Sequence, residues 1–158
     1  MGVAIRPIVE SDADFMRSMA LAIGRIWLEA GHEFEPKDLM VYLDGWGREG
    51  DLGVVAMAGD REVGAAWLRL FDYEACGPGF VSPGVPELAM AAEPYARGEV
   101  EDRLVDGLFL LARSQKVAFV STAVPSDCEE KALLESLGFA DAGFSDEQDA
   151  LQILLACL

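Results

Sequence analysis

The sequence predicts an α/β fold: one domain over residues 1–158, with a mixed central sheet of about six or seven strands flanked by about four helices. Two observations support this prediction. Segments with apolar residues at helical spacing alternate with short β-rich runs, and no internal repeat or linker interrupts them. The length of 158 residues suits one domain, and an apolar fraction of 52% is ample for one core.

The first half of the chain is predicted to form a strand, two helices and a β-hairpin. Their ranges are 3–9, 12–29, 36–45, and 52–57 with 62–71. The longer helix is predicted from Phe15, Met19 and Ile23, which recur at helical spacing. Pro36 suits the first turn of the second helix. Gly59 tolerates the positive φ that a hairpin turn needs.

The second half begins with a loop over 72–86 that is rich in glycine and proline. A strand, helix, strand, helix and two final strands are then predicted over 87–92, 100–114, 117–124, 128–137, 140–144 and 150–157. Pro94 cannot donate to a sheet, so the first of these strands ends before it. Gly138 suits the C-terminal cap of the last helix.

The charge of the chain disfavours two classes of partner. It has 28 acidic and 12 basic residues, a net charge of −16. Such a surface repels the phosphate backbone of nucleic acids and the surface of anionic membranes, so we expect neither as a partner. Two interpretations of the excess charge stay open. It attracts a cationic substrate, such as an amine or a basic peptide, or it is a generic acidic surface that keeps the protein soluble.

Other features bear on the compartment and on metals. No apolar run approaches the roughly 18–20 residues of a membrane helix, and the N-terminus does not resemble a secretory signal. The three cysteines, Cys76, Cys128 and Cys157, are scattered, which argues against a disulfide framework or a zinc site and favours a reducing compartment. We therefore expect a cytoplasmic protein. No metal site is expected, because His32 has no partner at a recognised spacing and acidic pairs such as Asp146–Glu147 are interpreted as solvated charges.

Three segments match a known family in order and spacing. They are REVGAAWLRLF at 61–71, PELAMAAEPYARG at 86–98 and ESLGF at 135–139. They resemble the third strand, the fourth strand with its acetyl-CoA loop, and the LGF signature of the GCN5-related N-acetyltransferases (GNAT). The resemblance covers nearly the whole chain. It implies the GNAT fold and transfer of an acetyl group from acetyl-CoA to a primary amine, on a small molecule or a peptide.

The resemblance also implies roles for individual residues. The Ala92 backbone N–H would polarise the thioester carbonyl, with Met90 on the same strand, and Glu87 would act through water as the base. Backbone N–H groups and the helix dipole would hold the pyrophosphate of the coenzyme. The positions implied there are Arg97, Gly98, Val100 and Arg103. Cys128 stands where an Asn often contacts the pantetheine arm.

The sequence departs from the family loop, Q/R-x-x-G-x-G/A. Two alignments with this pattern are possible. If Arg97–Gly98 is aligned with the start of the pattern, the loop is one residue short and Glu101 stands at the second glycine position. Anchored on Leu104, both glycine positions hold carboxylates, Glu99 and Glu101. A carboxylate about 4 Å from a phosphate costs about 4 kcal/mol at an effective dielectric near 20, against a gain of about 0.3–1 kcal/mol from the helix terminus. The same acids are also good first-turn residues of an ordinary helix.

A second departure lies in the LGF segment. Leu134 stands where many family members have a tyrosine that protonates the departing thiolate. Two functions therefore stay open: an acetyltransferase, or a GNAT-fold protein that has lost acetyl-CoA binding and serves as a ligand-binding or interaction module. A different acyl donor is a third alternative, and a homodimer is left open. Of the tryptophans, we expect Trp27 in the core and Trp46 beside an acceptor cleft.

Overall fold

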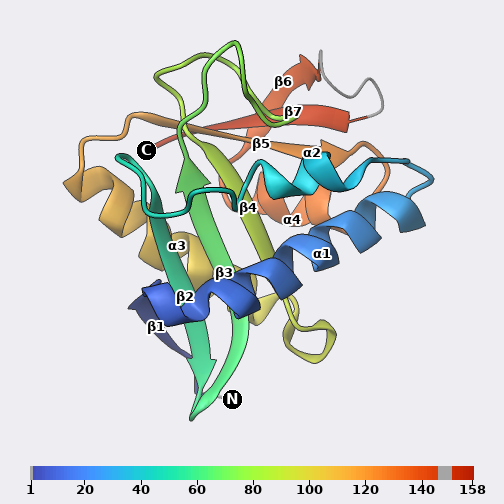
Figure 1. The fold of residues 1–158 in the computed structure, drawn as a ribbon. Helices are drawn as coiled ribbons and strands as arrows, with labels where there is room; N and C mark the ends of the chain where they lie inside the picture. The colour runs from blue at the N-terminus through green and yellow to red at the C-terminus, as the bar shows by residue number, and fades with distance from the viewer. Residues whose placement is uncertain (1, 146–150) are drawn as a thin grey trace.

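The computed structural model describes residues 2–145 and 151–158, which form one seven-stranded sheet with helices on both faces (Figure 1). The elements in chain order are β1 (Ala4–Pro7), η1 (Glu10–Asp12), α1 (Ala13–Glu29), α2 (Pro36–Met40), β2 (Leu52–Ala58), β3 (Arg61–Arg69), β4 (Glu87–Ala92), η2 (Pro94–Ala96), α3 (Glu99–Ser114), β5 (Phe119–Pro125), α4 (Glu129–Ser136), β6 (Ala140–Phe144) and β7 (Leu151–Cys157). The predicted α/β class with a mixed sheet is confirmed.

The sheet has two antiparallel parts joined by one parallel contact. Its order is β1-β2-β3-β4-β5-β7-β6, and every neighbouring pair is antiparallel except β4 and β5. The parallel pair matches at a single position, Glu87 opposite Ser121, whereas β3 and β4 match at six. The two parts of the sheet therefore separate beyond Glu87, and this separation positions the site described below.

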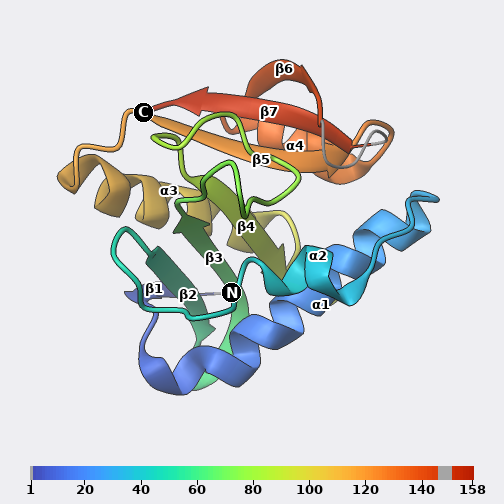
Figure 2. The ribbon, with the colours of Figure 1, turned by 45° about the horizontal axis from the view of Figure 1, so that its top comes forward.

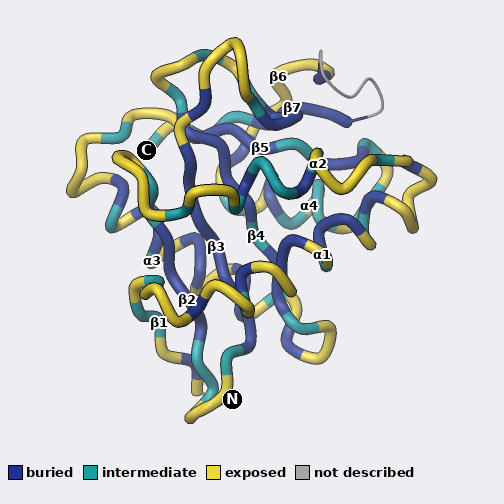
Figure 3. The backbone as a smooth tube through the Cα atoms, viewed as in Figure 1, coloured by how far each residue is buried: buried dark blue, intermediate teal, exposed yellow. Residues whose placement is uncertain are grey.

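Alternation along the central strands divides the core into two layers. In β3, Ala66 and Leu68 pack with α3, whereas Ala65 and Trp67 face α1. This follows from the two-residue period of a strand, which sends successive side chains to opposite faces. Figure 2 shows the same arrangement, with α1 and α3 on opposite sides of the sheet. In Figure 3 the central strands are buried and the connecting loops carry most of the exposed backbone.

The helix predicted over 36–45 is shorter in the structure. α2 ends at Met40, and the chain continues in turns to Gly47. The buried guanidinium of Arg69 explains the difference, because its Nη1 donates to the carbonyl oxygens of Val41 and Asp44, at 3.2 and 2.5 Å. These bonds fix the turns in place of further helix. The other predicted elements are present with ends that agree or differ by one or two residues, and residue 150 of the last predicted strand lies outside the described residues.

Among the described residues, no helix is both long and apolar enough to span a membrane.

Candidate active site

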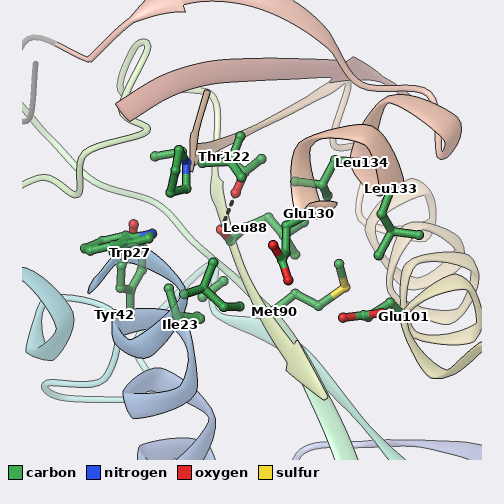
Figure 4. Close-up of a pocket in the computed structure, with 15 residues that line it drawn as sticks. Ile23, Trp27, Tyr42, Leu88, Met90, Glu101, Thr122, Glu130, Leu133 and Leu134 are labelled. Carbon is green, nitrogen blue, oxygen red and sulfur yellow. Dashed lines mark hydrogen bonds between the residues drawn. The ribbon is translucent and has the colours of Figure 1, made fainter. Parts of the chain in front are cut away.

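The gap between β4 and β5 forms a cleft that passes through the sheet. From the face of α1 and α2 it is lined by Ile23, Trp27 and Tyr42, and from the face of α3 and α4 by Glu101, Glu130 and Leu133. Leu88 and Met90 of β4 and Thr122 of β5 form its walls, and the Thr122 hydroxyl donates to the Leu88 carbonyl at 3.0 Å (Figure 4). The cleft is therefore lined by side chains from both faces of the sheet.

The edge of β4 that faces this gap presents backbone N–H groups. Glu93 donates its N–H to the Val63 carbonyl of the β3 side at 2.8 Å. Because the amides of a strand alternate in direction, the N–H groups of Ala92 and Met90 point the other way, toward β5. β5 no longer pairs with β4 at these positions. Both amides can therefore donate to a carbonyl oxygen placed in the gap.

Glu87 is a buried carboxyl group at the start of β4. Only 1% of its surface is exposed, and the Tyr42 hydroxyl donates to its Oε2. Burial raises the pKa of Glu87 from 4.5 to about 7, although the hydrogen bond from Tyr42 and the nearby Gly79 N–H lower it in part. Its second oxygen, Oε1, is buried without a full hydrogen bond to any described residue. Such a group can take or give a proton at neutral pH.

Tyr42 connects this carboxyl group to the cleft, since it lines the cleft and contacts Glu87. Burial and the adjacent Glu87 charge raise the pKa of Tyr42 well above its ordinary value, so the hydroxyl keeps its proton. The indole N–H of Trp67 donates to the Tyr42 carbonyl at 3.0 Å and holds the turn that carries the ring.

The loop between β3 and β4 encloses the same carboxyl group. A Cβ at Gly77 would lie 2.6 Å from Oε1 and 2.7 Å from Oε2 of Glu87. A Cβ at Gly79 would lie 3.0 Å from the carboxyl carbon and 2.8 Å from the backbone of β5. Both glycines thus provide the space into which the Glu87 side chain fits.

The N-terminus of α3 is capped by the chain itself. Gly98 is the N-cap with a φ of 95°, and its N–H donates to the Glu101 carboxylate at 2.5 Å. Glu101 is buried and lines the cleft, whereas Glu99 is exposed and faces away. Val100 is wholly buried in the α3 core layer, so only its backbone could contact a ligand.

An ion pair crosses the groove between α3 and α4. The Arg97 guanidinium, before α3, bonds to the Glu130 carboxylate in the first turn of α4. Arg97, Gly98, Glu101, Glu129 and Glu130 line this groove, which opens into the cleft through Glu101 and Glu130. Figure 4 shows the Glu130 and Glu101 side chains reaching toward Met90 from the two helices.

Comparison with known proteins identifies the fold. No protein-family model matches the sequence, and no curated protein matches it significantly. An acetyltransferase of the GNAT family from Staphylococcus aureus Mu50 is similar in structure, with a TM-score of 0.73, 13% identity and 99% of both chains covered. A ribosomal-protein-alanine N-acetyltransferase from Brucella melitensis gives a TM-score of 0.67 and 21% identity over 98% of this chain and 99% of that one. The GNAT domain of S. lividans PAT gives 0.68 and 15% over 99% of this chain and 90% of that one.

The chain has the GNAT fold. The fold expected from the three sequence segments is therefore confirmed.

The GNAT fold brings most of the predicted site residues to one region. Met90 lines the cleft, Ala92 and Arg97 line an adjoining hollow beside α1, and Gly98 lines the groove. Glu87 lies one residue behind the cleft wall, next to Tyr42. Arg103 is exposed on α3 and lines none of these spaces.

Cys128 is the N-cap of α4. Its Sγ donates to the Pro125 carbonyl at 3.2 Å, and burial raises the pKa of the thiol. The neighbouring Leu134 is buried and lines the cleft, where it offers no proton.

The structure also shows site residues that the sequence did not indicate. Tyr42 and Glu130 had no signal in the sequence, because their partners lie 45 and 33 positions away and no short motif joins them. Trp27 is buried in the core, as expected, but it also lines the cleft. Trp46, expected beside the acceptor cleft, packs edge-on against Trp67 and under Arg69 instead.

Neither His32 nor an acidic cluster offers a metal site in the described chain. His32 is buried with its ring edge-on to Trp27. Among the described residues, no group of three or more His, Cys, Asp or Glu side chains could hold a metal ion. Asp146 and Glu147 lie outside the described residues.

The groove in this conformation does not fit the diphosphate of a coenzyme. The N-cap N–H of α3 and the arginine are two of the donors that a diphosphate would use, and each already binds a carboxylate of the chain. The cleft beyond it has a volume of about 50 Å³, room for a few water molecules and not for a pantetheine arm.

Proposed function

We propose that the protein is an N-acetyltransferase that moves an acetyl group from acetyl-CoA to a primary amine. The observation that carries this proposal is the buried Glu87–Tyr42 pair, which lies beside a strand edge whose amides face an open gap in a GNAT fold. A base that titrates near neutral pH and a set of amide donors are what acyl transfer to an amine requires.

Direct attack uses these groups in one step. The acetyl carbonyl accepts hydrogen bonds from the N–H groups of Ala92 and Met90, which polarise the C=O bond. The amine nitrogen attacks the carbonyl carbon, and the C–S bond to the coenzyme breaks. The proton of the amine passes to the Tyr42 oxygen while the Tyr42 proton passes to Glu87 Oε2, which leaves Tyr42 unchanged and Glu87 protonated.

The thiolate leaves without an acid from α4. A thiol has a pKa near 8.5, so its anion is a moderate base that water can protonate. Leu134 at the usual tyrosine position therefore lowers the rate without excluding the reaction. On the donor side, we propose that the Gly98 N–H, the Val100 N–H and Arg97 contact the diphosphate, and that Cys128 lies near the pantetheine arm.

A second function is favoured by the carboxylates in the groove. Glu101 and Glu130 occupy two of the donors that a diphosphate would use, as expected of a GNAT-fold protein that has lost acetyl-CoA binding and serves as a ligand-binding module. The two functions differ in whether acetyl-CoA binds at all.

Thiol release from acetyl-CoA in the presence of a panel of primary amines tests the proposal. We expect amine-dependent release by the native protein and a loss of about 10²-fold or more in Glu87→Gln, the range for a missing general base. Glu135→Gln, which removes an exposed carboxylate from α4, is the matched control and should keep full activity. No release with any amine, together with no binding of acetyl-CoA, would favour the binding module.

A further inference from the structure

Two carboxylates of the chain occupy donor groups in the groove between α3 and α4. Glu130 reaches across it to Arg97, and Glu101 bends back over the first turn of α3 to the Gly98 N–H. Among the described residues that line the groove, Arg97 is the cationic side chain and Gly98 provides the N-cap amide, and the two contacts involve both. The remaining lining residue with a charge, Glu129, is exposed and adds a further negative charge at the entrance.

The two carboxylates stand where an anionic ligand would bind. The N-terminus of a helix attracts negative charge through its free N–H groups and its dipole, and arginine binds phosphate and carboxylate with the same planar donors. In this chain Glu101 binds the N–H at the helix N-terminus, and Glu130 binds the arginine. They are therefore competitors of a ligand's phosphates and not merely neighbours of them.

We propose that Glu101 and Glu130 form an intramolecular latch that must open before the diphosphate of acetyl-CoA can enter. This inference rests on the proposed function, since it concerns the donor of that reaction. In the open state Glu130 turns outward, Arg97 is released to the diphosphate, and the Gly98 N–H exchanges the Glu101 carboxylate for a phosphate oxygen.

The local structure allows this exchange. The Arg97 side chain is 37% exposed and that of Glu130 is 16% exposed, so each can turn toward solvent without unfolding an element. A diphosphate carries more negative charge than one carboxylate and offers the planar arginine the same kind of acceptor oxygens, so it can displace Glu130 from Arg97. Glu101 is more deeply buried, at 4%, and its release also opens the cleft beneath it.

Calorimetric titration with coenzyme A tests the latch by affinity and not by turnover. Glu130→Gln removes the charge of the latch and keeps its shape, and Glu101→Gln keeps an oxygen for the Gly98 N–H. Each variant should lower the Kd of coenzyme A by about tenfold to a hundredfold, the range for one charged hydrogen bond. Glu135→Gln on the same helix should leave the Kd unchanged, which controls for net charge.

A double variant identifies where the gain arises. Arg97→Gln combined with Glu130→Gln should lose most of the affinity gained by Glu130→Gln alone, because the released arginine is then missing. If the double variant keeps the gain, Arg97 is not the group that the latch restrains, and the proposal is wrong. Thermal unfolding of each ligand-free variant shows that the fold is kept.

The results of the titrations distinguish a failure of the latch proposal from a failure of the proposed function. Equal Kd values for the native protein, Glu130→Gln and Glu101→Gln would overturn the latch and leave the acetyltransferase standing. No binding of coenzyme A at millimolar concentration by any of the proteins would overturn the donor itself, and the latch with it.

Discussion

Glu87 is held in an environment where its charge is costly. Because the pKa of Glu87 is raised in the folded state, from 4.5 to about 7, its contribution to stability is greatest below the unfolded value and is lost as the pH rises through about 7. Between pH 4.5 and pH 8 this loss amounts to about 3 kcal/mol.

The substitution Glu87→Gln should remove that pH dependence. The amide does not titrate, so the free energy of unfolding of the native protein should fall relative to the variant by about 3 kcal/mol between pH 4.5 and pH 8. Urea unfolding of both proteins across this range measures the difference, and all other carboxylates cancel in it. A constant difference across the range would show that Glu87 does not titrate there.

Tyr42 is expected to tune the same group. Its hydrogen bond lowers the pKa of Glu87, so Tyr42→Phe should raise that pKa above about 7. The acid limb of the pH profile of kcat/KM should then move to higher pH, with a lower maximum because the proton path through the hydroxyl is lost. Tyr73→Phe, at an exposed tyrosine, should leave the profile in place. An unmoved limb in Tyr42→Phe would mean that another group sets it.

Among the elements, the loop between β3 and β4 depends on two glycines for its contact with the site. Gly77→Ala would place a methyl group 2.6 Å from the Glu87 carboxylate, and we expect it to destabilise the fold by about 1–3 kcal/mol and to lower activity. Gly84→Ala in the same loop meets nothing within 4 Å and should change stability by less than about 1 kcal/mol. Equal effects of the two substitutions in urea unfolding would argue against a tight fit around Glu87.

The elements also show what sequence patterns can predict. Helical spacing located α1 and α3 to within one residue at their starts, because each helix buries an apolar stripe against one face of the sheet. The end of α2 was not predictable, since it depends on Arg69, 25 or more positions along the chain, donating to its last turns. Local sequence patterns predict which segments are helical. They do not predict which side chain, distant in sequence, donates a hydrogen bond to a backbone carbonyl oxygen.

The same distinction applies to the candidate site. Glu87, Met90, Ala92 and Gly98 were predicted from one continuous segment that resembles the family. The orientation of Glu101 was not predictable, because the same residue could have turned outward to solvent or inward to the Gly98 N–H. Tyr42 and Glu130 come from other segments and become neighbours of the site only through the fold.

For the whole molecule, the net charge of −16 predicts a salt-dependent preference among acceptors. Long-range attraction should raise kcat/KM for an amine with two or more positive charges at low ionic strength, and added salt should screen this gain. Rates for a polycationic amine and for a singly charged one, measured from low salt to about 0.5 M, give the comparison. Equal salt slopes would favour the interpretation of the charge as a generic acidic surface.

The proposed function requires that this GNAT fold still binds acetyl-CoA. Thermal unfolding with and without acetyl-CoA tests it most directly, because a ligand at 100 times its Kd stabilises the folded state by about 2.7 kcal/mol. We predict a rise in the melting temperature of the native protein at millimolar acetyl-CoA, and a larger rise for Glu130→Gln. No shift in either protein would contradict the proposed function.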